Sequence, residues 1–306
     1  MISASRIKYI QSLRLKKYRD RHGVFVAEGA KIVQELADSP MQIDMVCGLA
    51  GWMEQNRGRL PEEVTCITIT EKELSRLSTL KTPNQVLAVV KKPDAGDLPD
   101  QEQEDLVLAL DTLQDPGNLG TIIRTADWFG IRTIYCSPDT ADVYNPKVIQ
   151  STMGSFIRIR LIYTDLKELL RQSGRNVYGA FLQGEPLHTQ QPEVPAALVI
   201  GNESEGISAE IEAFVNRKVL IPRHRTEDIS VTDTRPGKGD SPGNDSGPGK
   251  DFGPGKGAGN GGRPDQGSGK GSGTGKDSGT DKGGENGPES LNAAIAAGIL
   301  MSWFRR

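Results

Sequence analysis

Between residues 106 and 221 the sequence alternates short, continuous apolar runs with segments in which apolar residues recur every three or four positions. Continuous apolar runs are typical of strands that are covered on both faces, as in a parallel sheet between helices. The strand-like runs lie at 106–110, 133–136, 157–163, 177–182, 198–200 and 218–221, and the helical segments at 119–129, 147–153, 166–172 and 209–215. The pattern predicts an α/β fold with a mostly parallel sheet.

The first 92 residues show the same alternation on a smaller scale. Strand-like runs lie at 24–27, 43–47, 64–69 and 86–90, with helical segments at 30–37 and 71–77. Before them, Ser3 or Ser5 can cap one helix that has apolar residues at positions 7, 10 and 13 and ends at Gly23. Residues 1–92 are therefore predicted to form a small separate α/β domain, followed by a polar linker at 93–104.

A long Gly-rich segment interrupts the C-terminal domain, which we assign to residues 105–306. Residues 233–287 consist mainly of Gly, Pro, Ser, Asp and Lys, and such a composition cannot bury enough surface to offset the entropy of ordering it. We therefore predict a disordered insert. After it, Ser290 can cap a last helix. Outside its apolar stripe this helix carries mainly alanines and a glycine, whose small side chains allow another helix to approach closely. The predicted apolar stripe of this helix comprises Leu291, Ile295, Ile299 and Trp303.

The charge is distributed unevenly along the chain. The whole chain has a formal net charge of -3, but within its first 31 residues eight lysines and arginines face only Asp20 and Glu28. Such a basic patch attracts phosphates, although a solvated helix face explains the same charges equally well.

Several classes of protein are disfavoured by the sequence. The three cysteines, at positions 47, 66 and 136, lack metal-ligand spacing, and their odd number argues against a disulfide framework. The three histidines form neither a metal site nor a catalytic triad, so no metal is expected. No apolar run is long enough to span a membrane, and no signal-peptide pattern is visible. These features predict a cytoplasmic protein without a membrane segment.

Three short blocks place polar residues directly after apolar strands. The first spans residues 110–130, the second spans 198–206, and the third begins at 220–222 and resumes beyond the insert at 289–292. Ligands bind at the carboxyl edge of open parallel sheets. We therefore expect the three turns to meet there and to form one site.

These blocks carry a specific resemblance. The run from Asn118 through Arg124 to Ala126 resembles the first motif of the SpoU/TrmH family of RNA ribose 2′-O-methyltransferases. The run GNESEG at 201–206 is similar to the second motif, and Ile-Pro at 221–222 with Ser-Leu-Asn at 290–292 is similar to the third. The resemblance covers nearly all of the chain except the insert.

The resemblance implies a fold and an activity. The C-terminal domain would be a SPOUT methyltransferase domain threaded into a deep trefoil knot, one of the rare exceptions to the rule against threaded chains. It would bind S-adenosylmethionine, act as a homodimer and methylate a ribose 2′-hydroxyl in RNA. A separate N-terminal substrate-binding domain favours ribosomal RNA of the 23S type over transfer RNA.

The resemblance also implies roles for individual residues. The implied catalytic residues are Asn118, Arg124, Glu203 and Asn292. The implied cofactor-binding residues are Gly201, Ile221, Pro222, Ser290 and Leu291. The basic N-terminal region would supply RNA contacts from Arg14, Lys16, Lys17, Arg19 and Lys31.

Elementary chemistry restricts these roles. A guanidinium whose pKa exceeds about 12 is a poor base, so we interpret Arg124 as a grip on the phosphate next to the target ribose rather than as the proton acceptor. The structural alternative is a surface arginine near a helix start. Glu203 either orients a loop amide, Asn292 or the nucleotide, or is an ordinary turn residue. Asn292 either contacts a ligand or caps the last helix.

The third block departs from the family pattern because the insert at 233–287 replaces a short turn. Lengthening a flexible loop about tenfold costs about 2 kcal/mol, so folding is expected to survive. Cofactor affinity is less secure, since the short turn would normally wall the adenosyl pocket. The alternative function is therefore a catalytically silent RNA-binding relative that acts in ribosome assembly.

Overall fold

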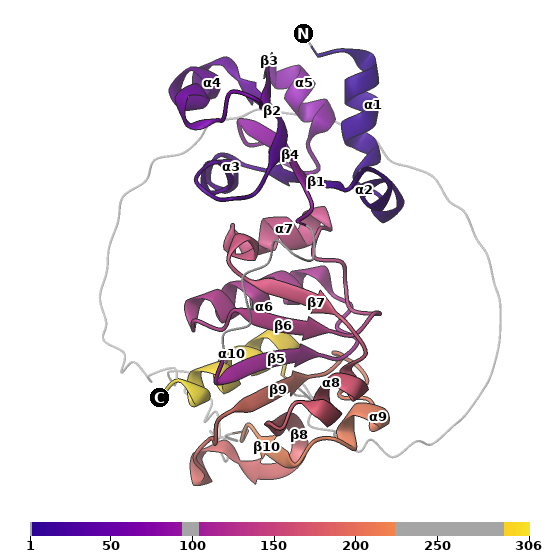
Figure 1. Cartoon of the computed structure of the whole chain (residues 1–306), viewed down its shortest axis with the longest axis vertical. Coiled ribbons are helices and arrows are strands. Elements are labelled where there is room, and N and C mark those ends of the chain that lie inside the picture. The colour runs from indigo at the N-terminus through magenta and orange to yellow at the C-terminus, as the bar shows by residue number, and fades with distance from the viewer. Residues whose placement is uncertain (1, 94–103, 224–290) are drawn as a thin grey trace, which may run out of the picture. The chain divides into compact units, whose positions relative to one another are not determined.

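The computed structural model describes residues 2–93, 104–223 and 291–306, whose helices and strands are labelled in Figure 1. Most of the predicted linker, the predicted insert and Ser290 lie outside the described residues. Two sheets organise the described part of the chain, a mixed sheet of four strands and a parallel sheet of six.

The N-terminal layer is built on the four-stranded sheet, in the order β1-β4-β2-β3. β4 is antiparallel to both of its neighbours, and β2 is parallel to β3. The strands are β1 (Val24–Glu28), β2 (Ile43–Leu49), β3 (Thr65–Ile69) and β4 (Val86–Lys91). The helical segments are α1 (Ala4–Ser12), α2 (Lys16–His22), α3 (Ala30–Ala37), α4 (Ala50–Asn56), η1 (Arg57–Arg59) and α5 (Glu71–Leu77).

The predicted single first helix is two helices. Ser3 caps α1 as expected, and Gly23 ends α2 in the left-handed conformation at φ 62°. The chain breaks between them because the carbonyls of Leu13 and Arg14 accept hydrogen bonds from the buried Arg19 side chain, at 3.0 and 2.7 Å. The Arg19 side chain occupies carbonyls that a continuous helix would use for its own backbone hydrogen bonds. The spacing of apolar residues carries no information about such a side-chain contact.

The six-stranded sheet has the order β10-β8-β9-β5-β6-β7, and every neighbouring pair is parallel. This confirms the predicted α/β fold with a mostly parallel sheet. The strands are β5 (Leu106–Leu110), β6 (Thr133–Cys136), β7 (Arg160–Tyr163), β8 (Asn176–Pro186), β9 (Ala196–Ile200) and β10 (Arg217–Leu220). The helices are α6 (Pro116–Trp128), α7 (Pro146–Thr152), α8 (Leu166–Gln172), α9 (Ala209–Glu212) and α10 (Ala293–Phe304), with short turns η2 (Ser155–Ile157) and η3 (Leu187–Thr189).

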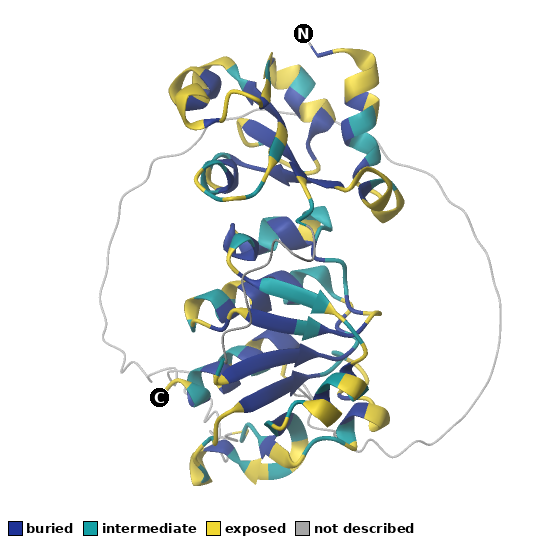
Figure 2. Ribbon diagram, viewed as in Figure 1, coloured by how far each residue is buried: buried dark blue, intermediate teal, exposed yellow. Residues whose placement is uncertain are grey.

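The central strands of this sheet are buried (Figure 2), and apolar residues form a core on each of its two faces. Along β5, Leu106, Leu108 and Leu110 belong to the large core that includes α6 and α10. Val107 and Ala109 point the other way, into a second core with residues of α8 and α9. This two-sided burial explains why the strands read as continuous apolar runs rather than as alternating ones.

Helix α10 packs against α6 through its small residues. Ala293, Ala294 and Ala297 are buried, and a Cβ added to Gly298 would lie 3.7 Å from the Thr125 methyl carbon. The predicted apolar stripe is divided, because Trp303 is buried against Tyr178 at a ring-centroid distance of 5.7 Å. Its other members stay exposed, with relative accessible surface areas of 49% for Leu291, 54% for Ile295 and 36% for Ile299. Within the described ranges, no helix combines the length and hydropathy needed to cross a bilayer.

Candidate active site

The first block ends β5 and begins α6. Asp115 caps the helix by accepting a hydrogen bond from the Asn118 amide at 2.8 Å, and Pro116 occupies the first helical position. Both residues are favoured there, because the carboxylate satisfies a free amide and proline has no amide to satisfy. Thr112, between strand and helix, has a φ of 54°, a strained value for a residue other than glycine. The block therefore holds Asn118 in the first turn of α6.

The second block forms a closed turn after β9. Asn202 and Gly206 exchange backbone hydrogen bonds at 2.8 and 3.0 Å, and the Asn202 side chain accepts from the amides of Ser204 and Glu205. Gly206 has a φ of 72°. A Cβ on Gly201 would lie only 2.2 Å from the Gly206 carbonyl carbon, so the turn needs glycine at this position. These contacts fix the backbone that carries Glu203.

The third block supplies Asn292, which caps α10. Its Oδ1 accepts from the amides of Ala294 and Ile295 at 2.9 and 3.3 Å. Its Nδ2 donates to Asn118 Oδ1 at 2.9 Å. Asn292 therefore caps the last helix, one of the two roles considered for it, and its side chain also contacts the first block.

The three blocks meet in a chain of hydrogen bonds. Asn118 Nδ2 donates to Glu203 Oε1 at 2.8 Å, and Asn118 Oδ1 accepts from Asn292 at 2.9 Å. We call Glu203, Asn118 and Asn292 the amide triad. Asn118 is its central member, so Glu203 orients Asn118 rather than Asn292. Glu203 and Asn118 are half-buried and Asn292 is exposed, which places the triad where a ligand from solvent can reach it.

Two further residues tie the first and second blocks together. The carboxylate of Asp111, which is 4% exposed, accepts from the Ser208 amide at 2.8 Å. Asn202 Nδ2 donates to the Thr112 carbonyl at 2.9 Å. Sequence reasoning did not select either residue. Asp111 could have been selected, because an acidic residue directly after a buried strand often lies at a functional edge of the sheet. Asp111 and Asn202 hold the turns that present Asn118 and Glu203.

Arg124 lies on the exposed face of α6, six residues beyond Asn118 and so about 9 Å farther along the helix axis. Among the described residues it has no hydrogen-bond or ion-pair partner. The structure does not bring Arg124 into the amide triad. Its guanidinium is available to a ligand that extends along α6.

Lys147 is a cation near the site that sequence reasoning did not select. It lies at the start of α7, and its Nζ is 3.4 Å from Asp115 Oδ2. Helix α7 approaches α6 closely because Gly120 faces it, where a Cβ would lie 2.4 Å from Ser151 Cβ. The hydrogen bond from the Asn118 amide, and then the charge of Lys147, lower the pKa of Asp115. The helix cap therefore stays ionised at neutral pH.

The predicted cofactor residues follow two strands of the sheet. Gly201 follows β9, and the half-buried Ile221 and Pro222 follow β10. Ile221 packs against the large core. Leu291 directly precedes the α10 cap and is half-exposed, whereas Ser290 is not among the described residues.

The predicted RNA-binding residues divide into two groups. Arg14, Lys16, Lys17 and Lys31 are exposed, although Arg14 donates to the carbonyls of Leu77 and Ser78 and Lys16 pairs with Asp20. Arg19 is different, because its side chain is 3% exposed and pairs with Asp142 at 2.6 Å. Arg19 is therefore removed from the proposed RNA-binding set, since a buried guanidinium that is already paired cannot reach a phosphate.

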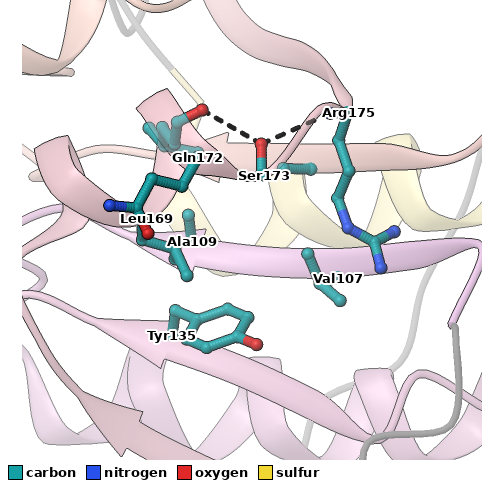
Figure 3. Close-up of a pocket in the computed structure, with 9 residues that line it drawn as sticks. Val107, Ala109, Tyr135, Leu169, Gln172, Ser173 and Arg175 are labelled. Carbon is teal, nitrogen blue, oxygen red and sulfur yellow. Dashed lines mark hydrogen bonds between the residues drawn. The ribbon is translucent and has the colours of Figure 1, made fainter.

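A cavity of about 250 Å³ lies elsewhere, between the parallel sheet and α8 (Figure 3). Val107, Ala109 and Ala197 form its apolar part, and Tyr135 and Arg175 add polar groups. No member of the amide triad lines this cavity, and Arg175 already donates to the Glu104 carbonyl at 2.5 Å. The chemistry of the three blocks, rather than this cavity, defines the candidate site. Across the described residues, no cluster of three or more His, Cys, Asp or Glu side chains is suited to a metal ion.

The arrangement defines a class: an α/β protein with a site assembled from strand-end turns of a parallel sheet and preceded by a four-stranded α/β layer. The SpoU rRNA methylase family matches residues 105–228, and the MRM3-like substrate binding domain matches residues 4–88. A structure described as a putative RNA methyltransferase of the TrmH family from Porphyromonas gingivalis is 32% identical, with a TM-score of 0.70 over 100% of this chain and 98% of that one. The chain belongs to the SpoU/TrmH family of RNA methyltransferases.

Two other proteins are similar to this chain. The 23S rRNA (guanosine(2553)-2′-O)-methyltransferase RlmP of Bacillus subtilis is 29% identical over 235 residues, which are 74% of this chain and 91% of RlmP. The AdoMet-bound rRNA methyltransferase from Sinorhizobium meliloti is 24% identical, with a TM-score of 0.71 over 100% of this chain and 96% of that one. The latter shares the fold.

Proposed function

We propose that this protein transfers a methyl group from S-adenosylmethionine to a ribose 2′-hydroxyl of 23S-type ribosomal RNA. The observation that carries the proposal is the amide triad, in which all three blocks meet through two hydrogen bonds of 2.8 and 2.9 Å. Family membership and the similarity to RlmP support the reaction and the class of RNA.

The residues present fit the cofactor. At Gly201 the turn offers main chain rather than side chain, because a Cβ would collide with the Gly206 backbone. Ile221, Pro222 and Leu291 would add an apolar wall for the adenosyl group. Ser290 stays a proposed cofactor-binding residue outside the described ranges. When bound, S-adenosylmethionine would supply a methyl carbon on a cationic sulfur for transfer to the ribose oxygen, and the sulfur would keep the electron pair of the carbon–sulfur bond. The reaction needs no metal, but the ribose hydroxyl must lose its proton during or after the attack.

The protein's own contribution is mainly positioning, which can lower a barrier by several kcal/mol. Glu203, as a carboxylate, can only accept hydrogen bonds, so it fixes which end of the Asn118 amide faces Asn292. Arg124 grips the phosphate beside the target ribose, since its guanidinium can bind two phosphate oxygens at once. Together they align the ribose hydroxyl with the methyl carbon.

We assign the first RNA contact to α2. Replacing both Lys16 and Lys17 by glutamate is expected to weaken binding of a 23S rRNA transcript and to reduce the slope of log K against log salt by about one to two, because each lost phosphate contact removes one counterion-release step. Filter binding at several salt concentrations measures both quantities. Reversing Lys167 and Arg171, two exposed cations of α8, is the matched control and should leave the slope unchanged. An unchanged slope in the Lys16 and Lys17 variant contradicts the assignment.

A homodimer is part of the proposal. Leu291, Ile295 and Ile299 form an exposed apolar stripe on α10, and such stripes commonly mark contact surfaces. Ile295→Asp should convert a dimer of twice the 33.1 kDa chain mass into a monomer, as measured by light scattering. Leu182→Asp, at another exposed apolar residue, is the control and should stay dimeric. A monomeric wild-type protein contradicts this part of the proposal.

The proposal also includes a trefoil knot and a cytoplasmic location, with no membrane partner. The knot depends on the path between β10 and α10, which runs through residues outside the described ranges.

Transfer of labelled methyl from S-adenosylmethionine to a 23S rRNA transcript tests the function. The label should appear in an alkali-resistant dinucleotide, because a 2′-O-methyl group blocks cleavage by base. Titration calorimetry with the cofactor distinguishes the active methyltransferase from a catalytically silent RNA-binding relative. The silent relative is expected to show no binding at millimolar cofactor. Label found on a base rather than on a ribose contradicts the proposed reaction.

A further inference from the structure

Arg19 links two parts of the fold that lie far apart in sequence. Its Nη1 donates to the carbonyls of Leu13 and Arg14, in the break between α1 and α2, and its Nη2 donates to Asp142 at 2.6 Å. The two side chains of this ion pair are only 3% and 14% exposed. A buried charge pair is costly to desolvate, and loss of one partner leaves the other charge unpaired. Arg19 therefore holds α2 in a defined place against Asp142.

Asp142 lies in loop 137–145, between β6 and α7, and this loop is held firmly. The Tyr163 hydroxyl donates to the Ala141 carbonyl at 2.6 Å and accepts from the Val143 amide at 2.9 Å, on either side of Asp142. The other carboxylate oxygen of Asp142 accepts from the Tyr144 amide at 3.1 Å. Asp142 is thus a fixed acceptor for Arg19.

The same loop supports the turn that precedes Asn118. Thr140 Oγ1 donates to the Leu110 carbonyl at 3.1 Å, and the Ala141 amide donates to the Leu113 carbonyl at 2.9 Å. The Thr112 amide, in the strained turn, donates to Ser137 Oγ at 2.8 Å. A short series of bonded groups therefore connects Arg19 through Asp142 to the first block.

Helix α2 has two functional faces. Lys16 and Lys17 are exposed, whereas Arg19 is buried and bound to Asp142. Lys17 lies on the side of the helix away from Arg19, and Lys16 lies about one turn before Arg19. RNA that binds the exposed lysines is therefore held by a helix that is itself fixed to the loop behind Asn118.

From these contacts we infer that Arg19 and Asp142 are positioning residues. They fix the RNA-binding helix relative to the amide triad, so that bound RNA presents its ribose at a constant place. The inference rests on the proposed function and adds to it a coupling between RNA binding and transfer.

The test compares two isosteric variants of ion pairs that join the N-terminal layer to the C-terminal domain. Asp142→Asn removes the charge that faces Arg19. Glu35→Gln is the matched control, because Glu35 accepts from Arg158 at 3.0 Å and Arg158 in turn pairs with Asp127, near the far end of α6, rather than with the turn that precedes Asn118. Single-turnover transfer to a 23S rRNA transcript is measured at saturating RNA and cofactor, together with both dissociation constants. Hydrogen exchange of the backbone amides of residues 111–118, apart from Pro116, is followed in the same proteins.

We expect Asp142→Asn to slow transfer about 10- to 100-fold, because small displacements of reacting groups have effects of that size. The dissociation constants for cofactor and RNA should change by less than about threefold, amides 111–118 should exchange faster, and Glu35→Gln should resemble wild type in every measurement. Arg19→Lys, which keeps the charge but loses the planar fork, should give an intermediate rate.

Three results would overturn the inference: a wild-type rate in Asp142→Asn, an equal rate loss in Glu35→Gln, or a rate loss matched by lost cofactor affinity. If the wild-type protein transfers no methyl group, the proposed function fails on its own. Hydrogen exchange then tests whether the Arg19–Asp142 pair supports the turn before Asn118. That support is contradicted if the amides in 111–118 exchange equally fast in Asp142→Asn and Glu35→Gln.

Discussion

Replacing Arg124 by alanine is expected to slow methyl transfer about 100-fold or more, while the melting temperature and the cofactor dissociation constant stay close to wild type. Arg124 is exposed and has no hydrogen-bond or ion-pair partner among the described residues, so its removal leaves no internal group unpaired. What is lost is the grip on the phosphate, and a ribose displaced by about 1 Å can react about 100-fold more slowly. Single-turnover rates, thermal melts and calorimetry measure the three quantities.

Two further variants sharpen this prediction. Arg124→Lys keeps the charge but cannot bind two oxygens in one plane, so it should recover only part of the rate. Arg171→Ala removes another exposed arginine, on α8, and should transfer at the wild-type rate. If Arg124→Ala were to keep the wild-type rate, Arg124 would be an ordinary surface residue. If it lost cofactor affinity in the same proportion, its role would lie in the cofactor pocket.

Gly201→Ala is expected to abolish transfer and to destabilise the fold. The new Cβ would lie 2.2 and 2.3 Å from backbone atoms of Gly206 and 2.3 Å from the Ile207 nitrogen. Backbone atoms cannot rotate away, so the turn must move and carry Glu203 away from Asn118. Overpacking of this kind typically costs about 1–3 kcal/mol, which corresponds to a fall of several degrees in melting temperature.

The matched control is Gly51→Ala, because a Cβ there would meet no atom within 4 Å. That variant should melt within about two degrees of wild type, since alanine also has the higher helix propensity. Differential scanning calorimetry and the transfer assay test the pair. A Gly201→Ala protein with wild-type melting and activity would show that the turn after β9 tolerates a side chain, and the proposed geometry of the second block would be wrong.

Most of the fold could be predicted from the spacing of apolar residues, because strands and helices turn their side chains toward the core at different, regular intervals. The strands β5 and β6 agree with the predicted ranges, and the parallel order of the six-stranded sheet confirms the predicted class. Helix α4 was missed, because Gly51 stands in its first turn and no side chain caps it. The predicted helix at 209–215 is only Ala209–Glu212, and the predicted strand at 157–163 begins at Arg160.

The candidate site was only partly predictable. The three blocks identified the residues that meet, and they indicated the family to which the chain belongs. They did not identify Asn118 as the centre of the triad, nor Asp111 and Asn202 as its supports. Partners separated by 85 and 174 residues depend on where whole elements pack, and no local pattern records this.

The sequence alone determined the class of fold, the order of the strand-end blocks and the family, because these depend on local periodicity and on residues that stand close together in the chain. The tertiary structure alone decided which polar groups are paired. Arg19 shows the difference, since by composition it belongs to a basic patch, yet folding places it 3% exposed against Asp142. A charge binds an external phosphate only when no internal partner has already desolvated and paired it.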